Sequence, residues 1–400
     1  MNPLRNSVRA GFLFSSKGDI GCLFRHRFGW RLIISRIFFS YGIFLPYWGA
    51  WLKGEGHDVA TVGLLLSVGL VARFIGSLFI TPLFKDPSRL IFALRLMALC
   101  SFIFAVAFWF GSHWIWLFFV MAGFNLFFSP MIPLGDSLAA TWQKQFPMDY
   151  GTIRVWGSVA FIIATSVTGL LMDVWKHDVI LVALIVSTAS LVLTSFLRPR
   201  IMPAGEQKQR GPQVAFRTLL KDKAVVRFLI CVSLLQGAHA AYYGFSVIYW
   251  QLVGYSDATI GYLWSLGVVA EVIVFSFSNK LFRRWSAANL LLLSGICGIL
   301  RWSLMGMSAA LPVLIIAQIL HSGTYTVCHL AAMKFIGARK SAEIIPLQAA
   351  YSALAMGGAI AVMTLVAGYL YEDIHGGIFY LMALTAIPAL FLRPKVRAQI

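Results

Sequence analysis

The sequence predicts an all-α membrane protein, with twelve transmembrane helices in two pseudo-symmetric six-helix bundles. Composition gives the first reason: of 400 residues, 59% are hydrophobic and 12% are charged, and the mean hydropathy is +0.80. A soluble domain averages about half apolar and a quarter charged residues. The apolar residues also gather in runs of about 20, long enough to cross ~30 Å of hydrocarbon as helices. The third reason is an internal repeat.

Twelve apolar runs follow one another along the chain, six in each half. They fall at 32–52, 61–83, 90–110, 114–134, 155–172 and 179–197, and then at 228–251, 259–278, 290–307, 311–333, 347–370 and 377–392. An even number of crossings returns the chain to the side from which it started. Both termini are therefore expected on one side of the membrane.

The repeat joins two stretches that lie 198 residues apart. Residues 61–73 read TVGLLLSVGLVAR and residues 259–271 read TIGYLWSLGVVAE, with seven of thirteen pairs identical. At the matched last position the first stretch has Arg73 and the second has Glu271. Two related bundles in the same orientation indicate a parallel repeat about an axis along the membrane normal.

The longest polar segment separates the two halves and defines the expected organisation. We expect a basic N-terminal arm at 1–31, a first bundle at 32–197, a cytoplasmic linker at 198–227, a second bundle at 228–392 and a tail at 393–400. The linker is rich in Pro, Gly, Gln, Lys and Arg, which cannot bury a core, apart from one amphipathic helix near residues 216–220.

The net charge of +18 reflects membrane topology. All but six of the 33 Lys and Arg residues lie in the termini or in the loops on one side. The exceptions are Lys53 and Lys176 in loops on the other side, and Arg36, Arg73, Arg95 and Arg301 within the spans. This positive-inside pattern places both termini in the cytoplasm and makes a nucleic-acid partner unnecessary.

Charges within the bilayer need an explanation, because each costs at least ~2.5 kcal/mol on insertion scales. Arg73 and Glu271 lie about halfway along their spans and are expected to face a central cavity, within reach of each other. We expect Arg73 to hold an anionic substrate through charge-assisted hydrogen bonds and Glu271 to exchange a coupling proton. A permanent ion pair that only joins the second and eighth spans is the alternative.

Other polar side chains within the spans are further candidates. We expect Asn125 to contact substrate, and Arg301 either to act as a second anion anchor or entry guide or to snorkel to the interface. His239 and His321 are candidates for a proton relay, with a hydrogen bond between helices as the structural alternative. His321, Cys328 and His329 do not predict a metal site, because His321 and His329 splay across a helix face and no fourth ligand is evident.

Aromatic and gating residues complete the candidate site. Tyr41 and Tyr243 occupy matched positions deep in the first and seventh spans and are expected to line the cavity. Asp136 ends the fourth span and Arg154 opens the fifth, so this pair is a candidate latch at the cytoplasmic gate. A static structural pair is equally compatible with their positions.

Long stretches of the sequence resemble the major facilitator superfamily, and within it the phenylpropionate permease subfamily. They include FFSYGIFLPYW, GLVARFIGSL, GFNLFFSPMIPLGDSLA, WQKQFPMDYGTIRVWGSVAF and GYLWSLGVVAEVIVFSFSNKLFRR, and together they span residues 30–396. The loop signature between the second and third spans is degenerate, since Lys85, Asp86 and Arg89 are what remains of it. The resemblance implies the fold of that superfamily and proton-coupled uptake of an aromatic monocarboxylate across a bacterial inner membrane.

The expected function is therefore secondary active transport, by a monomer embedded in the lipid bilayer, with an aromatic carboxylate and a proton as its partners. A proton symporter for a sugar or a nucleoside is the alternative within transport, and an integral-membrane enzyme or sensor is the alternative outside it. No nucleophile, metal set or nucleotide-binding loop stands out, and the loops are too short for a catalytic domain, so we expect neither an enzyme nor a cofactor.

Overall fold

The computed structural model describes residues 17–84, 86–145, 150–197, 201–204 and 214–394, and contains no strand within these ranges. The helices of the first half are α1 (Lys17–Gly54), α2 (Val59–Ile75), α3 (Leu90–Ala107), α4 (Trp114–Phe128), α5 (Met131–Gln145), α6 (Tyr150–Trp175) and α7 (Asp178–Ser195). Those of the second half are α8 (Phe216–Leu219), α9 (Lys223–Gly237), α10 (Ala240–Leu252), α11 (Asp257–Phe282), α12 (Ala287–Met307), α13 (Leu311–His321), α14 (Val327–Gly337), α15 (Ser341–Ala353), α16 (Ile360–Ile374) and α17 (Ile378–Leu392).

The described residues contain eleven helical stretches long and apolar enough to cross a membrane. The last of them, Ser341–Leu392, has 52 residues, which at 1.5 Å per residue is more than twice the ~30 Å of a bilayer core. It is divided by a tight turn at His375–Gly377, where His375 has a left-handed φ of 41°. Counting two crossings there gives the twelve that the sequence predicts, and the all-helical fold is confirmed.

The internal repeat is also present in the backbone. Gly56 and Gly254 lie 198 residues apart and have φ angles of 92° and 93°, a conformation that glycine adopts without steric cost. Each is followed by a helix with a side-chain cap. Asp58 accepts a hydrogen bond from Thr61 N at the start of α2, and Ser256 accepts one from Thr259 N at the start of α11. Matched sequence therefore produces matched turns.

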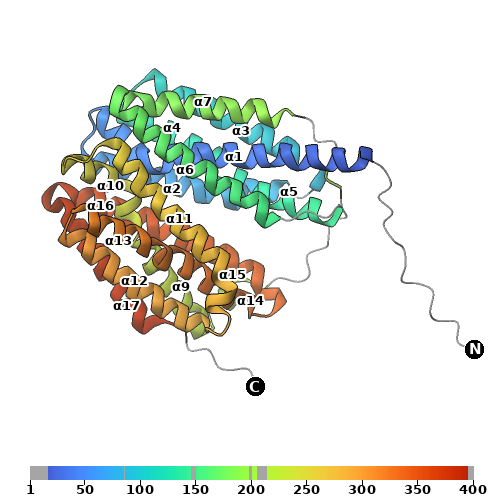
Figure 1. Ribbon diagram of the computed structural model, residues 1–400. Helices are drawn as coiled ribbons and strands as arrows, with labels where there is room; N and C mark the ends of the chain where they lie inside the picture. Colours follow the sequence, from blue (N-terminus) through green and yellow to red (C-terminus); the bar gives the residue numbers. More distant parts are fainter. Residues whose placement is uncertain (1–16, 85, 146–149, 198–200, 205–213, 395–400) are drawn as a thin grey trace, which may run out of the picture.

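The two halves form two groups of helices that meet at one end and diverge toward the end where the chain's termini leave (Figure 1). The main helix pairs that join them are α1 with α10, α2 with α16, and α6 with α11, and α2 also contacts the π-helical turn at Leu354–Ala359. Glycines allow the closest approach, since a Cβ on Gly63 would lie 2.8 Å from Gly368 Cα. The space between the halves is therefore closed at one end by backbone contact.

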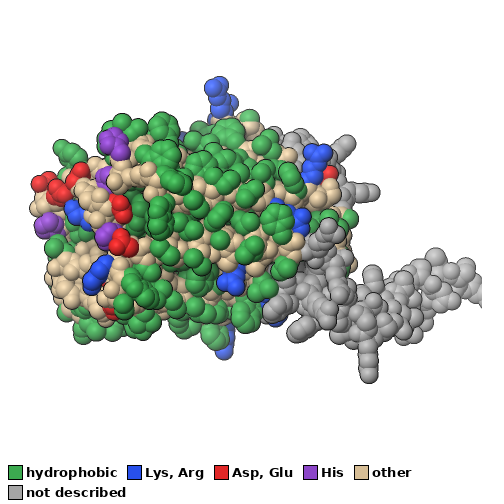
Figure 2. Space-filling view, turned by 90° about the horizontal axis from the view of Figure 1, so that it is seen from above, with side chains coloured by type: hydrophobic (Ala, Val, Ile, Leu, Met, Phe, Trp, Pro, Cys, Tyr) green, Lys and Arg blue, Asp and Glu red, His purple; other side chains and the backbone are tan. Residues whose placement is uncertain are grey.

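The outer surface is what a lipid-embedded protein needs. Figure 2 shows hydrophobic side chains over the middle of the molecule, acidic and histidine side chains gathered at one end, and most Lys and Arg toward the other. Large apolar side chains such as Phe119 and Leu193 are exposed. Exposure of this much apolar surface is unfavourable in water and favourable in the hydrocarbon of a bilayer.

Helix α1 begins at Lys17, and the first candidate membrane-spanning stretch is Arg31–Gly54, close to the predicted start of the first bundle at residue 32. The predicted domain bounds remain a prediction. Residues 1–16 and 395–400 lie outside the described residues. In the linker, the predicted helix near 216–220 is present as the four-residue α8.

An ion-pair cluster holds the start of the second half at the terminus-bearing end. Arg339, which follows α14, donates hydrogen bonds to Asp222 ahead of α9 and to Glu343 on α15, the latter at 2.9 Å. The hydrogen bond from Arg339 holds the pKa of Asp222 below its ordinary value. The stabilisation that this contact provides is therefore fully present above the ordinary carboxyl pKa and is lost as the pH falls through the lowered one.

We predict that Arg339→Gln lowers the free energy of unfolding at pH 7 by about 0.5–1 kcal/mol, because both carboxylates are partly exposed and screened. The difference from the unsubstituted protein should shrink when unfolding is measured at about pH 3. Detergent-solubilised protein and a denaturant titration suffice, with Arg284→Gln, an exposed arginine at the same end, as control. A difference that is the same at both pH values contradicts the prediction.

Candidate functional site

A cavity of about 630 Å³ lies between the two halves and is lined by residues from both. Arg73 from α2 and Glu271 from α11 both face it, as the repeat predicts. Its wall also includes Tyr41, Asp136, Arg154, Tyr243 and His321 among the predicted site residues. The volume falls in the range of about 300–1,000 Å³ that is usual for small-molecule sites.

Aromatic side chains make up much of this wall. They come from both halves and are Phe38, Tyr41, Phe161, Tyr242, Tyr243, Trp264, Phe275 and Tyr325. Such walls offer flat apolar surface to a ring, while the tyrosine hydroxyls add polar atoms. The cavity therefore combines an apolar surface with a few charged groups.

Arg73 is partly buried and is held by Tyr41. Its Nη1 donates a hydrogen bond to the Tyr41 hydroxyl, and its guanidinium carbon lies 5.3 Å from the centre of the Tyr41 ring. A guanidinium has five N–H donors, so this contact leaves others for a ligand in the cavity. The predicted contact between Arg73 and Glu271 is not among the ion pairs of the described residues, because Glu271 binds another partner.

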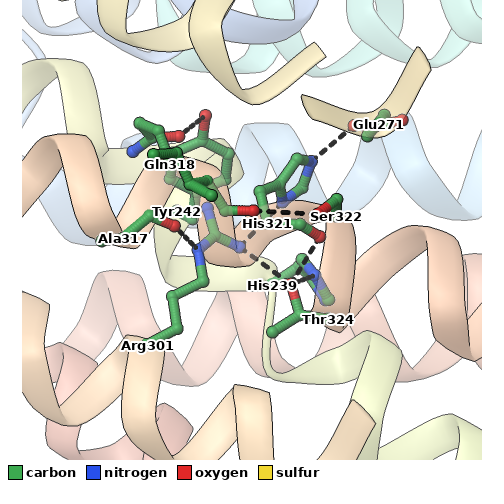
Figure 3. Close-up of polar contacts among 10 residues, drawn as sticks. His239, Tyr242, Glu271, Arg301, Ala317, Gln318, His321, Ser322 and Thr324 are labelled. Atoms are coloured by element: carbon green, nitrogen blue, oxygen red, sulfur yellow. Dashed lines mark hydrogen bonds and ion pairs between the residues drawn. The ribbon is translucent and has the colours of Figure 1, made fainter. Parts of the chain in front are cut away.

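Glu271 is paired with His321 on α13. Its Oε1 lies 2.7 Å from His321 Nε2, and His321 Nδ1 lies 2.8 Å from Arg301 Nη1 on α12 (Figure 3). Three helices of the second half thus supply one chain of polar contacts. His321 and Arg301 are buried, with 4% and 0% of their surfaces exposed, whereas the Glu271 side chain is 17% exposed at the cavity.

The hydrogen-bond donors among Glu271, His321 and Arg301 determine which ring nitrogen of His321 carries the proton. Arginine only donates, so His321 Nδ1 must accept from Arg301. The ring proton is then on Nε2 and is donated to Glu271 Oε1. A second proton on Nδ1 would face the Arg301 N–H group, so His321 is neutral in this arrangement. Glu271 is therefore the member of the chain that is placed to gain or lose a proton.

The structure places Arg301 apart from both expected positions, and its role in anion binding remains a prediction. It does not line the cavity and it does not reach the membrane interface, because its side chain is sealed inside the second half. Its Nε donates to Ala317 O at 2.9 Å, and its guanidinium lies over the rings of Tyr242 and Trp302 at 4.5 and 4.2 Å. Arg301 acts as a buried counter-charge to Glu271.

His239 and Asn125 are also held away from the cavity. His239 is fully buried, with Nδ1 3.1 Å from Leu235 O and Nε2 3.0 Å from Thr324 Oγ1, which itself accepts a bond from Arg301 at 3.2 Å. Asn125 Nδ2 donates to Met121 O at 3.0 Å, within its own helix. Neither residue lines the cavity, so a direct substrate contact by Asn125 finds no support here.

Asp136 and Arg154 lie on the cavity wall, and the Arg154 guanidinium lies 3.9 Å from the centre of the Phe38 ring. Their proposed role as a gating pair remains a prediction. In the described part of the chain, a group of possible metal ligands, Glu55, His177 and Asp178, occurs outside the cavity lining. The expectation of no metal site also remains a prediction.

Tyr325 and His329 line the cavity, although the sequence pattern did not predict them as site residues. A π-helical turn at Ser322–Thr326 widens the tenth span and brings His321, Tyr325 and His329 onto one face that lines the cavity. Their rings are spaced 5.7 and 6.5 Å apart in stacked orientations. The polar run HSGTYTVCH within an apolar span was the available signal, since π-helical turns occur frequently at functional sites.

Comparison with known proteins adds to this geometry. The model of the MFS_1 like family matches residues 31–382. The chain belongs to this family. The resemblance to the major facilitator superfamily noted from the sequence is thereby confirmed, and the chain is a multi-pass membrane transporter rather than an enzyme.

Two relatives illustrate this membership. The chain is 60% identical over 359 residues to the probable 3-phenylpropionic acid transporter of Escherichia coli (strain K12), covering 90% of this chain and 95% of the relative. It is 26% identical over 358 residues to the maltose permease of Geobacillus stearothermophilus, covering 86% and 88%. The crystal structure of the nucleoside transporter NupG superposes with a TM-score of 0.80 at 17% identity, covering 92% and 97%, which shows the fold alone.

We predict that Arg301→Met destabilises the protein by about 2 kcal/mol or more, because it leaves Glu271 and its histidine without their buried cation. Removing the opposing charge as well, in Arg301→Met with Glu271→Gln, should recover much of that loss. Thermal unfolding of both variants and of Glu271→Gln completes a double-mutant cycle. Strictly additive effects would show that the two charges do not interact through His321.

Proposed function

We propose that the protein is a proton symporter that takes up 3-phenylpropionate or a related aromatic monocarboxylate across the bacterial inner membrane. The observation that carries the proposal is one cavity with aromatic walls that has Arg73 on one half and Glu271 on the other. The relative that is 60% identical is named for 3-phenylpropionic acid, and this supports the substrate class.

Each end of such a substrate has a counterpart in the cavity. A carboxylate matches the planar guanidinium of Arg73, which can donate two parallel hydrogen bonds to it. A phenyl ring matches the aromatic walls, where edge or offset contacts add to apolar burial. An uncharged sugar or nucleoside would leave Arg73 without a charged partner, which favours the acid.

Coupling follows from the charge balance of the cavity. An anion bound alone brings a second negative charge near Glu271, and a proton bound alone leaves Arg73 and Arg301 without an opposing charge. Binding of the anion together with the proton leaves the net charge of the site unchanged. Each therefore favours binding of the other within the membrane, where net charge is costly. His321 stays neutral and links Arg301 to Glu271 through one hydrogen bond to each.

The direction of transport rests on the orientation of the molecule. The basic end that carries the termini corresponds to the cytoplasm under the positive-inside pattern. The halves diverge toward that end, so this conformation would expose the cavity to the cytoplasm, and rocking of the halves would expose it to the other side. One chain supplies the whole cavity, so we expect the monomer to be active.

Replacement of the proton site gives the decisive test. In proteoliposomes with an imposed pH gradient, Glu271→Gln should abolish uphill uptake of labelled 3-phenylpropionate while retaining exchange of internal for external substrate. Asp178→Asn, an exposed carboxylate outside the cavity lining, is the matched control. Gradient-driven uptake at the wild-type level would remove Glu271 from the mechanism.

Replacement of the anion site tests the substrate class. Arg73→Lys keeps the charge but loses the paired N–H groups, so the apparent affinity for 3-phenylpropionate should fall by about tenfold, which corresponds to about 1.4 kcal/mol. 3-Phenylpropanol, which lacks the carboxylate, should compete weakly against labelled substrate in both proteins. An unaltered affinity in the lysine variant would contradict the anchoring role.

A further inference from the structure

Two acidic side chains connect the halves at the end of the molecule opposite the termini. Asp173 lies in the last turn of α6, in the first half. Its Oδ1 accepts hydrogen bonds from the backbone N–H groups of Asp257, at 2.8 Å, and Ala258, at 3.4 Å. These are the first two residues of α11, in the second half.

The second connection is related to the first by the repeat. Glu372 lies in the last turn of α16, in the second half, and its Oε1 is 3.4 Å from the backbone nitrogen of Val59. Val59 is the first residue of α2, in the first half. Val59 and Asp257 are 198 residues apart, which is also the separation of Arg73 and Glu271. Each half thus extends a carboxylate to the start of the matched helix of the other.

The chemistry of these contacts is that of a helix N-terminus. The first N–H groups of a helix have no partner within it, and the helix dipole favours a negative charge beside them. The caps Asp58 and Ser256 already bind the third residue of each helix, Thr61 and Thr259. The carboxylate from the other half binds the N–H group of the first residue instead. The capping side chain and the carboxylate from the other half therefore do not compete for the same N–H group.

These contacts sit where a reversible seal is needed. They lie on the same helix pairs, α6 with α11 and α2 with α16, that close the cavity at this end. On the first pair, Ser166 and Ser265 also share a hydrogen bond of 2.9 Å between the halves. Both carboxylates are exposed to solvent, which keeps each contact weak enough to break.

The geometry points to Asp173 and Glu372 as paired latches that hold this end of the transporter closed and release together when the cavity opens there. The inference rests on the alternating access of the proposed function. Two weak, repeat-related contacts suit a rocking motion, because a single rotation of one half against the other separates both carboxylates from their helices.

Accessibility of the cavity provides the test. Val268→Cys adds a cysteine to the cavity wall, and a membrane-impermeant maleimide is applied to vesicles from each face in turn. Removing both latches, in Asp173→Ala with Glu372→Ala, should raise the rate of labelling from the end opposite the termini by about tenfold. That figure corresponds to about threefold for each helix-terminus contact. Labelling from the terminus-bearing end should fall in the same protein.

Controls separate the latch from general damage. Asp373→Ala removes a carboxylate beside Glu372 at the same end and should label like the parent chain, while Asp173→Glu should retain most of the closure. The chain without the added cysteine gives the background from the native thiols. Each single latch variant should give an intermediate rate.

The inference is overturned if the double variant labels at the parent rate from the end opposite the termini while labelling from the other end is preserved. The labelling needs neither substrate nor a pH gradient. Failure to transport an aromatic acid would therefore overturn the proposed function and leave the latch result unaffected, whereas unchanged labelling would overturn the latch alone.

Discussion

The contact chain of Glu271, His321 and Arg301 is the interaction on which the rest of the structure depends. A charge in a bilayer is costly. Here the neutral imidazole of His321 lies between the carboxylate of Glu271, at 2.7 Å, and the guanidinium of Arg301, at 2.8 Å. It also ties three helices together, since its members come from α11, α13 and α12. The atoms that stabilise the second half are therefore the same atoms that present a proton acceptor to the cavity.

The two halves contribute unequal chemistry to that cavity from equivalent positions. Arg73 is held by Tyr41 within the first half, and Glu271 is held within the second. Under the proposed function, motion between the halves would change the distance across the cavity, while each charge keeps its contacts within its own half. Under the proposed function, a bound carboxylate is what connects the arginine of one half to the charge state of the other. This arrangement gives coupling without a permanent ion pair across the interface.

Closure at the end opposite the termini depends on features of a different kind. Backbone approaches such as Gly63 with Gly368 bring α2 and α16 together, and acidic side chains meet the exposed N–H groups of helix ends. Each of these contacts is modest, as helix-terminus interactions are at a solvated surface. Under the proposed function this end opens and closes repeatedly, so several weak contacts serve better than one strong one.

The sequence by itself determined the helical membrane fold, the two related halves and the placement of Arg73 and Glu271 at a shared cavity. The length of the hydrophobic runs indicates helices that match the bilayer thickness. The repeat of constant spacing indicates that equivalent residues of the two halves fold in the same way. Only the tertiary structure decided which partner each charge has. The choice of His321 over Arg73 for Glu271, and the burial of Arg301, depend on how α11, α12 and α13 pack and on a π-helical turn, which no periodicity in the sequence specifies.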